Sequence, residues 1–187
     1  MRMIAMKPGK WVVVLAVMVA GFVAGQRAGG AQAKCPWLNA ATAGGFLGGE
    51  VQMTVSAPME TIPGQGTNYV PDQVRSDRFD VTCEFSRKAD ANTYTLSIMV
   101  KTMSNVSKDY AGYLASCTGP TVPLKGIGNE AVQCVSKNGN GEEEVISRVR
   151  NRAFVLTVHR AATTEGAADE LRADTHNMAE QVAGSIF

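Results

Sequence analysis

The feature that most constrains this chain is the position of its cysteines. All four follow an N-terminal segment with the layout of an export signal: Cys35, Cys83, Cys117 and Cys134. Exported proteins enter an oxidising compartment, where cysteines form disulfides. The placement therefore predicts a disulfide-stapled domain outside the cytoplasm.

The export signal itself is read from three parts. Residues 1–10 are basic with no acidic residue, residues 11–23 are apolar except for Gly21, and Ala31-Gln32-Ala33 supplies small residues at a cleavage site. An uncleaved anchor would need an apolar stretch of about 20 residues. Lipidation of Cys35 would need a small residue before it, and Lys34 stands there. We expect a signal peptide at 1–33 and no membrane span after cleavage.

The mature chain, 34–187, has the length of one domain with its own core. Cleavage removes Arg2, Lys7, Lys10 and Arg27, which leaves 14 basic and 17 acidic residues and a net charge of −3. A mildly acidic domain gains no counterion-release affinity for nucleic acid and no attraction to anionic lipid. Nucleic acid is therefore excluded as the expected partner.

Residue patterns along the mature chain predict an α+β fold, because alternating and helical periods succeed one another. The expected elements are a helix after Asn39, a strand at 51–56, a hairpin at 79–86 and 94–100, a helix from Ser107, a strand at 130–136, a hairpin at 143–150 and 153–160, and a helix at 168–186. The order is αβββαβββα. It predicts one antiparallel sheet of about six strands packed against helices.

Two stretches between these elements are predicted to be loops. Residues 59–77 are mostly polar, and a loop of that length is the first place to look for a binding surface. Residues 118–129 contain two prolines and three glycines. The helix before this second loop carries Tyr110, Tyr113, Leu114 and Cys117 on one stripe, which directs Cys117 to the core.

The four cysteines allow three disulfide pairings. Cys117 with Cys134 would tie the middle helix to the next strand, and Cys35 with Cys83 would tie the N-terminus to the first hairpin. Redox catalysis favours a Cys-x-x-Cys spacing, which the chain lacks. The disulfides are therefore interpreted as structural.

Motifs for catalysis or cofactor binding are weak. The glycines of 125–130 are not followed by Gly-Lys-Ser/Thr, so a turn is expected there rather than a phosphate loop. His159 and His176 have no metal-ligand spacing, and no Gly-x-Ser-x-Gly elbow occurs. We assign no catalytic, cofactor or metal residue and no cofactor.

Arginines near the last hairpin form a second candidate ligand surface, besides the 59–77 loop. Arg148 and Arg150 alternate on one predicted strand, and Arg152 begins the next, so together they could present a positive face to an anionic ligand. The alternative is a solvated strand surface balanced by the acidic run 142–144.

Four segments carry a resemblance to a known family: 35–39 (CPWLN), 46–48 (FLG), 83–85 (CEF) and 126–131 (GIGNEA). They resemble a family of bacterial exported domains best known as actinobacterial lipoproteins of unknown function. That family looks related to the PsbP and Mog-like α/β/α sandwich, whose members bind partners. The resemblance implies the antiparallel sheet and a Cys35–Cys83 bridge, and so leaves Cys117 to pair with Cys134.

We therefore expect a periplasmic or secreted, non-enzymatic binding or structural module. Its partner would be an unknown protein or a small or lipid ligand, bound at the 59–77 loop or the arginine surface. One alternative is a small hydrolase-like enzyme that uses His159, His176 and nearby acids. Another is a lipid carrier with an apolar cavity between sheet and helices.

Overall fold

The computed structural model describes residues 34–56, 80–89, 92–137, 142–160 and 167–186, which belong to one compact unit, Ala31–Phe187. These residues form an α+β fold, as the patterns predict. The predicted signal peptide, the 59–77 stretch and the hairpin turn at 138–141 lie outside the described residues.

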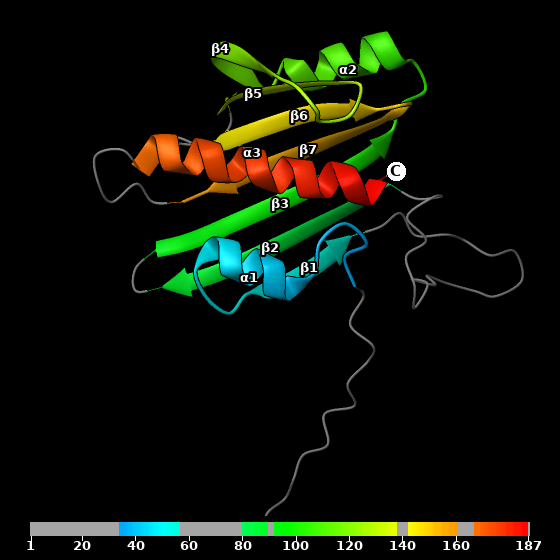
Figure 1. Cartoon of the computed structure of the whole chain (residues 1–187). Helices are drawn as coiled ribbons and strands as arrows, with labels where there is room; N and C mark the ends of the chain where they lie inside the picture. Colours follow the sequence, from blue (N-terminus) through cyan, green and yellow to red (C-terminus); the bar gives the residue numbers. More distant parts are fainter. Residues whose placement is uncertain (1–33, 57–79, 90–91, 138–141, 161–166, 187) are drawn as a thin grey trace, which may run out of the picture. The chain divides into compact units, whose positions relative to one another are not determined.

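The described residues form three helices and seven strands (Figure 1). In chain order they are α1 (Ala40–Leu47), β1 (Gln52–Ser56), β2 (Val81–Ala89), β3 (Asn92–Thr102), α2 (Val106–Leu114), β4 (Cys117–Leu124), β5 (Glu130–Ser136), β6 (Glu143–Val149), β7 (Arg152–His159) and α3 (Ala167–Ile186). The strands make one antiparallel sheet in the order β1-β2-β3-β7-β6-β5-β4. Two meanders therefore meet at the β3–β7 pair, and β1 and β4 form the sheet edges.

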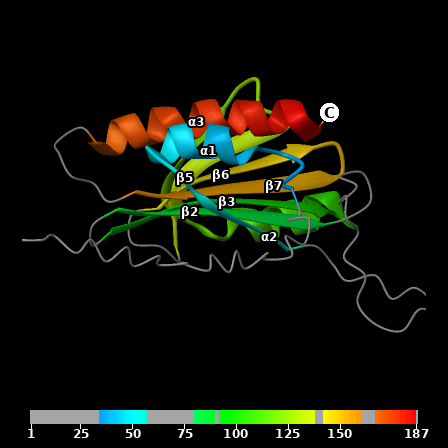
Figure 2. The ribbon, with the colours of Figure 1, turned by 90° about the horizontal axis from the view of Figure 1, so that it is seen from below.

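Helices cover both faces of the sheet (Figure 2). α1 and α3 lie on one face, where they bury a large apolar cluster with Phe85, Leu96 and Phe154 at its centre. α2 lies on the other face over a smaller cluster that includes Tyr110 and Ile146. The alternation of the strands supplies both clusters, since successive side chains point to opposite faces.

Local capping explains where α1 begins and ends. The Asn39 side chain accepts a hydrogen bond from the Thr42 N–H at 2.8 Å, as an N-cap does. Gly48 ends the helix with φ 80°, and a Cβ on Gly44 would lie 2.7 Å from the Gly49 carbonyl oxygen. The predicted start of this helix after Asn39 is confirmed.

The sequence prediction is wrong in the region of α2 and β4. The helix begins at Val106 with Asn105 as its N-cap, not Ser107, and it ends at Leu114. Cys117 lies on β4, and residues 117–124, most of them predicted as loop, form a seventh strand. The prolines and glycines of this segment led to the loop prediction. An edge strand tolerates these residues, whereas a central strand does not.

Both predicted disulfides are present, and none of the described cysteines is free. Cys35 bonds to Cys83 with a Cα–Cα distance of 5.7 Å, and Cys117 bonds to Cys134 with a Cα–Cα distance of 5.6 Å. Paired cysteines are typical of an oxidising, extracytoplasmic environment.

Candidate functional site

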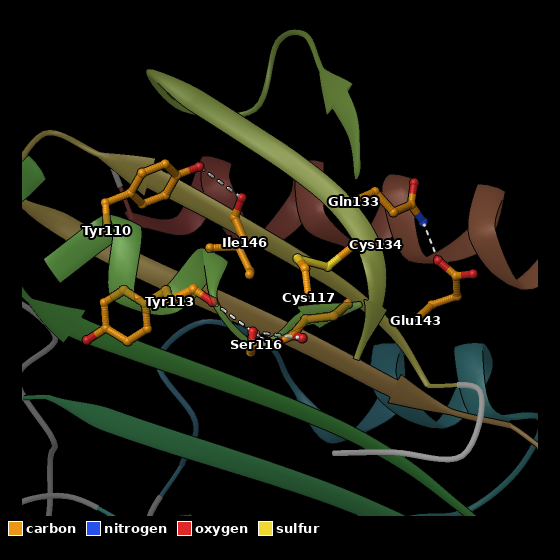
Figure 3. The surroundings of a disulfide bond; sticks show 9 residues. Tyr110, Tyr113, Ser116, Cys117, Gln133, Cys134, Glu143 and Ile146 are labelled. Atoms are coloured by element: carbon orange, nitrogen blue, oxygen red, sulfur yellow. Dashed lines mark hydrogen bonds between the residues drawn. A yellow bond between two sulfur atoms is a disulfide. The ribbon is translucent and has the colours of Figure 1, made fainter. Parts of the chain in front are cut away.

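Polar side chains gather around the Cys117–Cys134 disulfide, at the edge of the sheet formed by β4, β5 and β6 (Figure 3). Cys134 lies opposite Glu144 in the β5–β6 register, and Gln133 lies opposite Val145. Gln133, Glu143 and Glu144 are each 3–4 % exposed. Buried polar groups of this kind are costly unless they are hydrogen-bonded, so their partners matter.

The edge strand β4 bulges next to the disulfide. Thr118 pairs with Val135 and Val122 pairs with Gln133, so three residues of β4 face the single residue Cys134. Gly119 at the start of the bulge has φ 71°, and Pro120 cannot donate to the sheet ladder. The disulfide therefore holds β4 to β5 at the place where the pairing of the two strands is broken. Bulges of this kind are often found next to functional sites.

The bulge borders a hollow of about 420 Å³. Its walls are four residues of β4, residues 133–135 of β5, and Arg172 of α3; the β4 residues are Thr118, Gly119, Pro120 and Val122. Val122 is 47 % exposed, although it is apolar. The volume falls in the lower range of small-ligand sites. We call this feature the bulge hollow.

Buried hydrogen bonds fix the polar wall of the bulge hollow. The Gln133 Nε2 donates to Glu143 Oε2 at 3.3 Å and to the Arg172 carbonyl oxygen at 2.9 Å. The Arg172 guanidinium donates to Glu143 Oε1 at 3.4 Å. Glu143 therefore orients both the amide and the guanidinium that line the hollow.

On the other face of β6, Glu144 lies in a separate network. Ser116 Oγ lies 2.7 Å from the Tyr113 carbonyl oxygen and 3.1 Å from each carboxyl oxygen of Glu144. Desolvation by burial raises the pKa of Glu144, against the opposing effect of hydrogen bonds from Ser116 and Ser136. Ser116 has one proton. This proton can go either to the Tyr113 carbonyl oxygen or to a Glu144 carboxyl oxygen.

Tyr110 of α2 makes a separate hydrogen bond to β6. Its hydroxyl donates to the Ile146 carbonyl oxygen at 3.3 Å. Burial raises the pKa of Tyr110 to about 12, with a further contribution from Glu130 that Arg148 opposes. A phenol with that pKa stays protonated at physiological pH and acts as a hydrogen-bond donor.

The three predicted arginines lie at the β6–β7 turn. Arg148 shares its sheet face with Ala153, and Arg152 shares the opposite face with Val149. Arg150 lies in the turn itself, outside β6, with φ 56°. The arginines are thus neighbours along the chain, but strand alternation divides Arg148 and Arg152 between two faces. An anionic ligand here stays a prediction.

The acidic run was interpreted wrongly as a solvated partner of these arginines. Arg148 Nε bonds to Glu130 Oε1 at 2.6 Å, while Glu143 and Glu144 are buried at the other end of β6. Glu143 and Glu144 begin the predicted strand, and no neighbouring residue in the sequence indicates that they are buried. Gln133 and Arg172 gave no signal either, because their contact depends on how α3 crosses the sheet.

The two histidines lie on opposite sides of the sheet. His159 pairs with Thr95 on the face away from α3, 3.9 Å from Glu142, and His176 lies on α3, 3.7 Å from Glu180. The described residues contain no group of three His, Cys, Asp or Glu side chains placed to hold a metal ion.

Two larger hollows, of about 580 and 520 Å³, adjoin the α1–β1 connection. The charged side chain Arg87 lines the first, and its guanidinium donates to the Leu47 carbonyl oxygen at 2.9 Å and lies over the Tyr94 ring. A cation at the C-terminal end of a helix stabilises the helix dipole. A Cβ on Gly49 would lie 2.7 Å from Arg87 Nε, so the glycine makes room for this contact. The arginine is explained by the fold.

Comparison with known proteins found no matching family model, no matching curated protein and no matching solved structure. Within the described ranges, none of the helices combines the length and apolar character needed to cross a membrane. The functional argument therefore depends on the geometry of the described surface.

Proposed function

We propose that this protein is an exported, disulfide-stapled binding module without catalytic activity, and that it takes a small ligand in the bulge hollow. The observation that carries the proposal is the combination of a broken strand pairing with a buried amide and a half-exposed guanidinium, both oriented by Glu143, in one hollow. Small-ligand sites typically pair an apolar wall with a few fixed polar groups.

The alternatives fit the structure less well. A lipid carrier would hold its ligand between sheet and helices, where the described side chains of the larger cluster pack with almost no exposure; Leu47, Phe85, Leu96 and Leu156 are 0–2 % exposed. An enzyme that uses both histidines would need them on the same side of the sheet. They lie on opposite sides.

The proposal is tested by filling the bulge hollow from its rim. Val122 lines the hollow, whereas Thr121 is the neighbouring exposed residue of the bulge and does not line it. We expect Val122→Trp to abolish retention of a small molecule by the exported protein, and Thr121→Trp to leave retention unchanged. Native mass spectrometry of the protein purified under mild conditions measures the retained mass.

Equal retention by the wild type and both variants would place the ligand elsewhere and overturn the proposal. Two negative results together would also overturn the proposal: the wild type retains no mass, and a fragment screen of the wild type leaves the amide resonances of residues 133–135 unchanged.

A further inference from the structure

We infer that the bulge hollow recognises a peptide-like carboxylate, meaning a carboxylate with an amide N–H on the neighbouring atom. The inference rests on the proposed function and names the ligand class of the same hollow. A free C-terminal residue of a peptide and an N-acylated amino acid both carry this chemistry.

Arg172 supplies the partner for the carboxylate. A guanidinium carries five N–H donors in a planar fork that matches a carboxylate. Within the described part of the chain Arg172 donates one hydrogen bond, to Glu143, and its side chain is 46 % exposed. Donors therefore stay available on the side chain that lines the hollow.

The two carboxylates beside Arg172 leave its guanidinium able to bind a ligand carboxylate. Glu143 is 5 % exposed and lies behind the guanidinium, where it orients the group. Asp169 lies 3.8 Å away with its side chain 89 % exposed. An ion pair exposed to that degree is weak. A ligand carboxylate can therefore compete for the guanidinium.

Gln133 supplies the partner for the N–H. Both of its described hydrogen bonds use Nε2, which leaves Oε1 as an acceptor. Among the described residues only Trp37 Nε1 and His176 Nε2 are buried side-chain atoms without a hydrogen bond. Gln133 Oε1 is not one of these fully buried atoms, so it keeps a small exposed surface although Gln133 is 3 % exposed, and Gln133 lines the hollow. Figure 3 shows this oxygen directed away from Glu143.

The remaining wall accepts an apolar side chain. Pro120, Val122 and Val135 contribute it, and the exposed Val122 would lose solvent contact when a ligand binds. Burial of this apolar surface favours binding. A small aliphatic side chain between the carboxylate and the N–H fits a hollow of about 420 Å³.

Three probes of nearly equal size separate the parts of this inference. N-acetyl-L-valine carries the carboxylate and the N–H, its methylamide lacks the carboxylate, and N-acetyl-L-proline lacks the N–H. We expect N-acetyl-L-valine to shift the Gln133 side-chain amide and the Val122 and Val135 resonances in NMR titrations of the exported protein. Its affinity should exceed that of either other probe by at least fivefold.

Each other outcome is decisive. If the methylamide binds the hollow as tightly as N-acetyl-L-valine, the carboxylate is not recognised and this inference fails, while the binding module stands. If N-acetyl-L-proline binds as tightly as N-acetyl-L-valine, Gln133 does not recognise the N–H. The inference then fails, while the binding module again stands. If no probe shifts a residue of the hollow, this inference fails, and the retention experiment with Val122→Trp decides the proposed function separately.

Two arginine variants test whether the Arg172 guanidinium binds the ligand carboxylate. Arg172→Lys keeps a charge beside buried Glu143 and so preserves the fold, but it loses the planar fork, and we expect about a tenfold loss of affinity for N-acetyl-L-valine. The matched control is Arg160→Lys, because Arg160 bonds to Asp174 at 3.2 Å and does not line the hollow. Equal affinity of wild type and Arg172→Lys would overturn the role of Arg172.

Discussion

The two disulfides staple two different kinds of surroundings. Cys83 is fully buried on β2 in the large apolar cluster, where Val81 and Phe85 share its face. Cys134 is also buried, but it lies opposite the acid Glu144 and beside a broken strand pairing, and its partner Cys117 is half-buried. The first bond reinforces a core that packs by itself. The second bond holds the bulged edge strand β4, which borders a hollow, and the polar site forms there.

The largest effect is expected from removal of the first disulfide. On the chain-entropy model, the double variant Cys35→Ala and Cys83→Ala should lose about 4 kcal/mol of stability, because the bond closes a loop with a sequence separation of 48. Denaturant unfolding measures the loss. We expect the bulge hollow and its ligand binding to survive below the denaturation midpoint. If the folded double variant loses binding, the first disulfide also shapes the bulge hollow, and the two disulfides do not differ in this respect.

Removal of the second disulfide should cost less stability and more function. For Cys117→Ala with Cys134→Ala we expect a loss of about 3 kcal/mol, because the sequence separation is 17. Binding in the bulge hollow should be lost even in the folded protein, since β4 is no longer held across the bulge. Unfolding and ligand titration of the same sample check both parts. Unchanged binding would show that the sheet alone shapes the hollow.

A smaller effect is expected from Ser116→Ala. The substitution removes the hydroxyl that bridges Tyr113 and buried Glu144, so stability should fall by about 1–2 kcal/mol. Ser185→Ala is the matched control, because Ser185 is exposed and bonds only to the Gln181 carbonyl oxygen of its own helix. Its change should stay within about 0.5 kcal/mol. Equal effects of the two variants would show that the Glu144 network adds nothing to stability.

The smallest effect is a change in the pH profile. Burial raises the pKa of Glu144 above its ordinary value, so the unfolded chain loses this proton at lower pH than the folded one. Its contribution to stability is present below the ordinary pKa of a glutamate and is lost as pH rises through the raised value. Glu144→Gln should therefore gain stability relative to wild type as pH rises from 4 to 8. Parallel profiles over that range would contradict the raised pKa.

The regular parts of the fold could be predicted from the sequence. Period-two alternation on β2 and β3, and the apolar stripe of α3, report local packing that each segment carries in its own residues. These periodic elements were found because each depends on short-range patterns. The first disulfide was implied by the family resemblance, since four cysteines by themselves allow three pairings.

The candidate site could not be predicted, because it depends on contacts between residues that are far apart in the sequence. β4 has no alternating pattern, and Pro120 with Gly119 gave a loop signal. Gln133 meets Arg172 only because α3 crosses the sheet above β5 and β6. Glu143 and Glu144 looked solvated, since nothing local shows that one helix covers each face of β6.

The bulge of β4 also bears on how the protein behaves at high concentration. An edge strand offers unpaired backbone groups to any other strand that approaches, which is a route to aggregation. Pro120 and Pro123 remove donors from this edge, and the three residues opposite Cys134 bend it out of register. The distortion that opens the hollow thus also keeps this edge from pairing with a second chain.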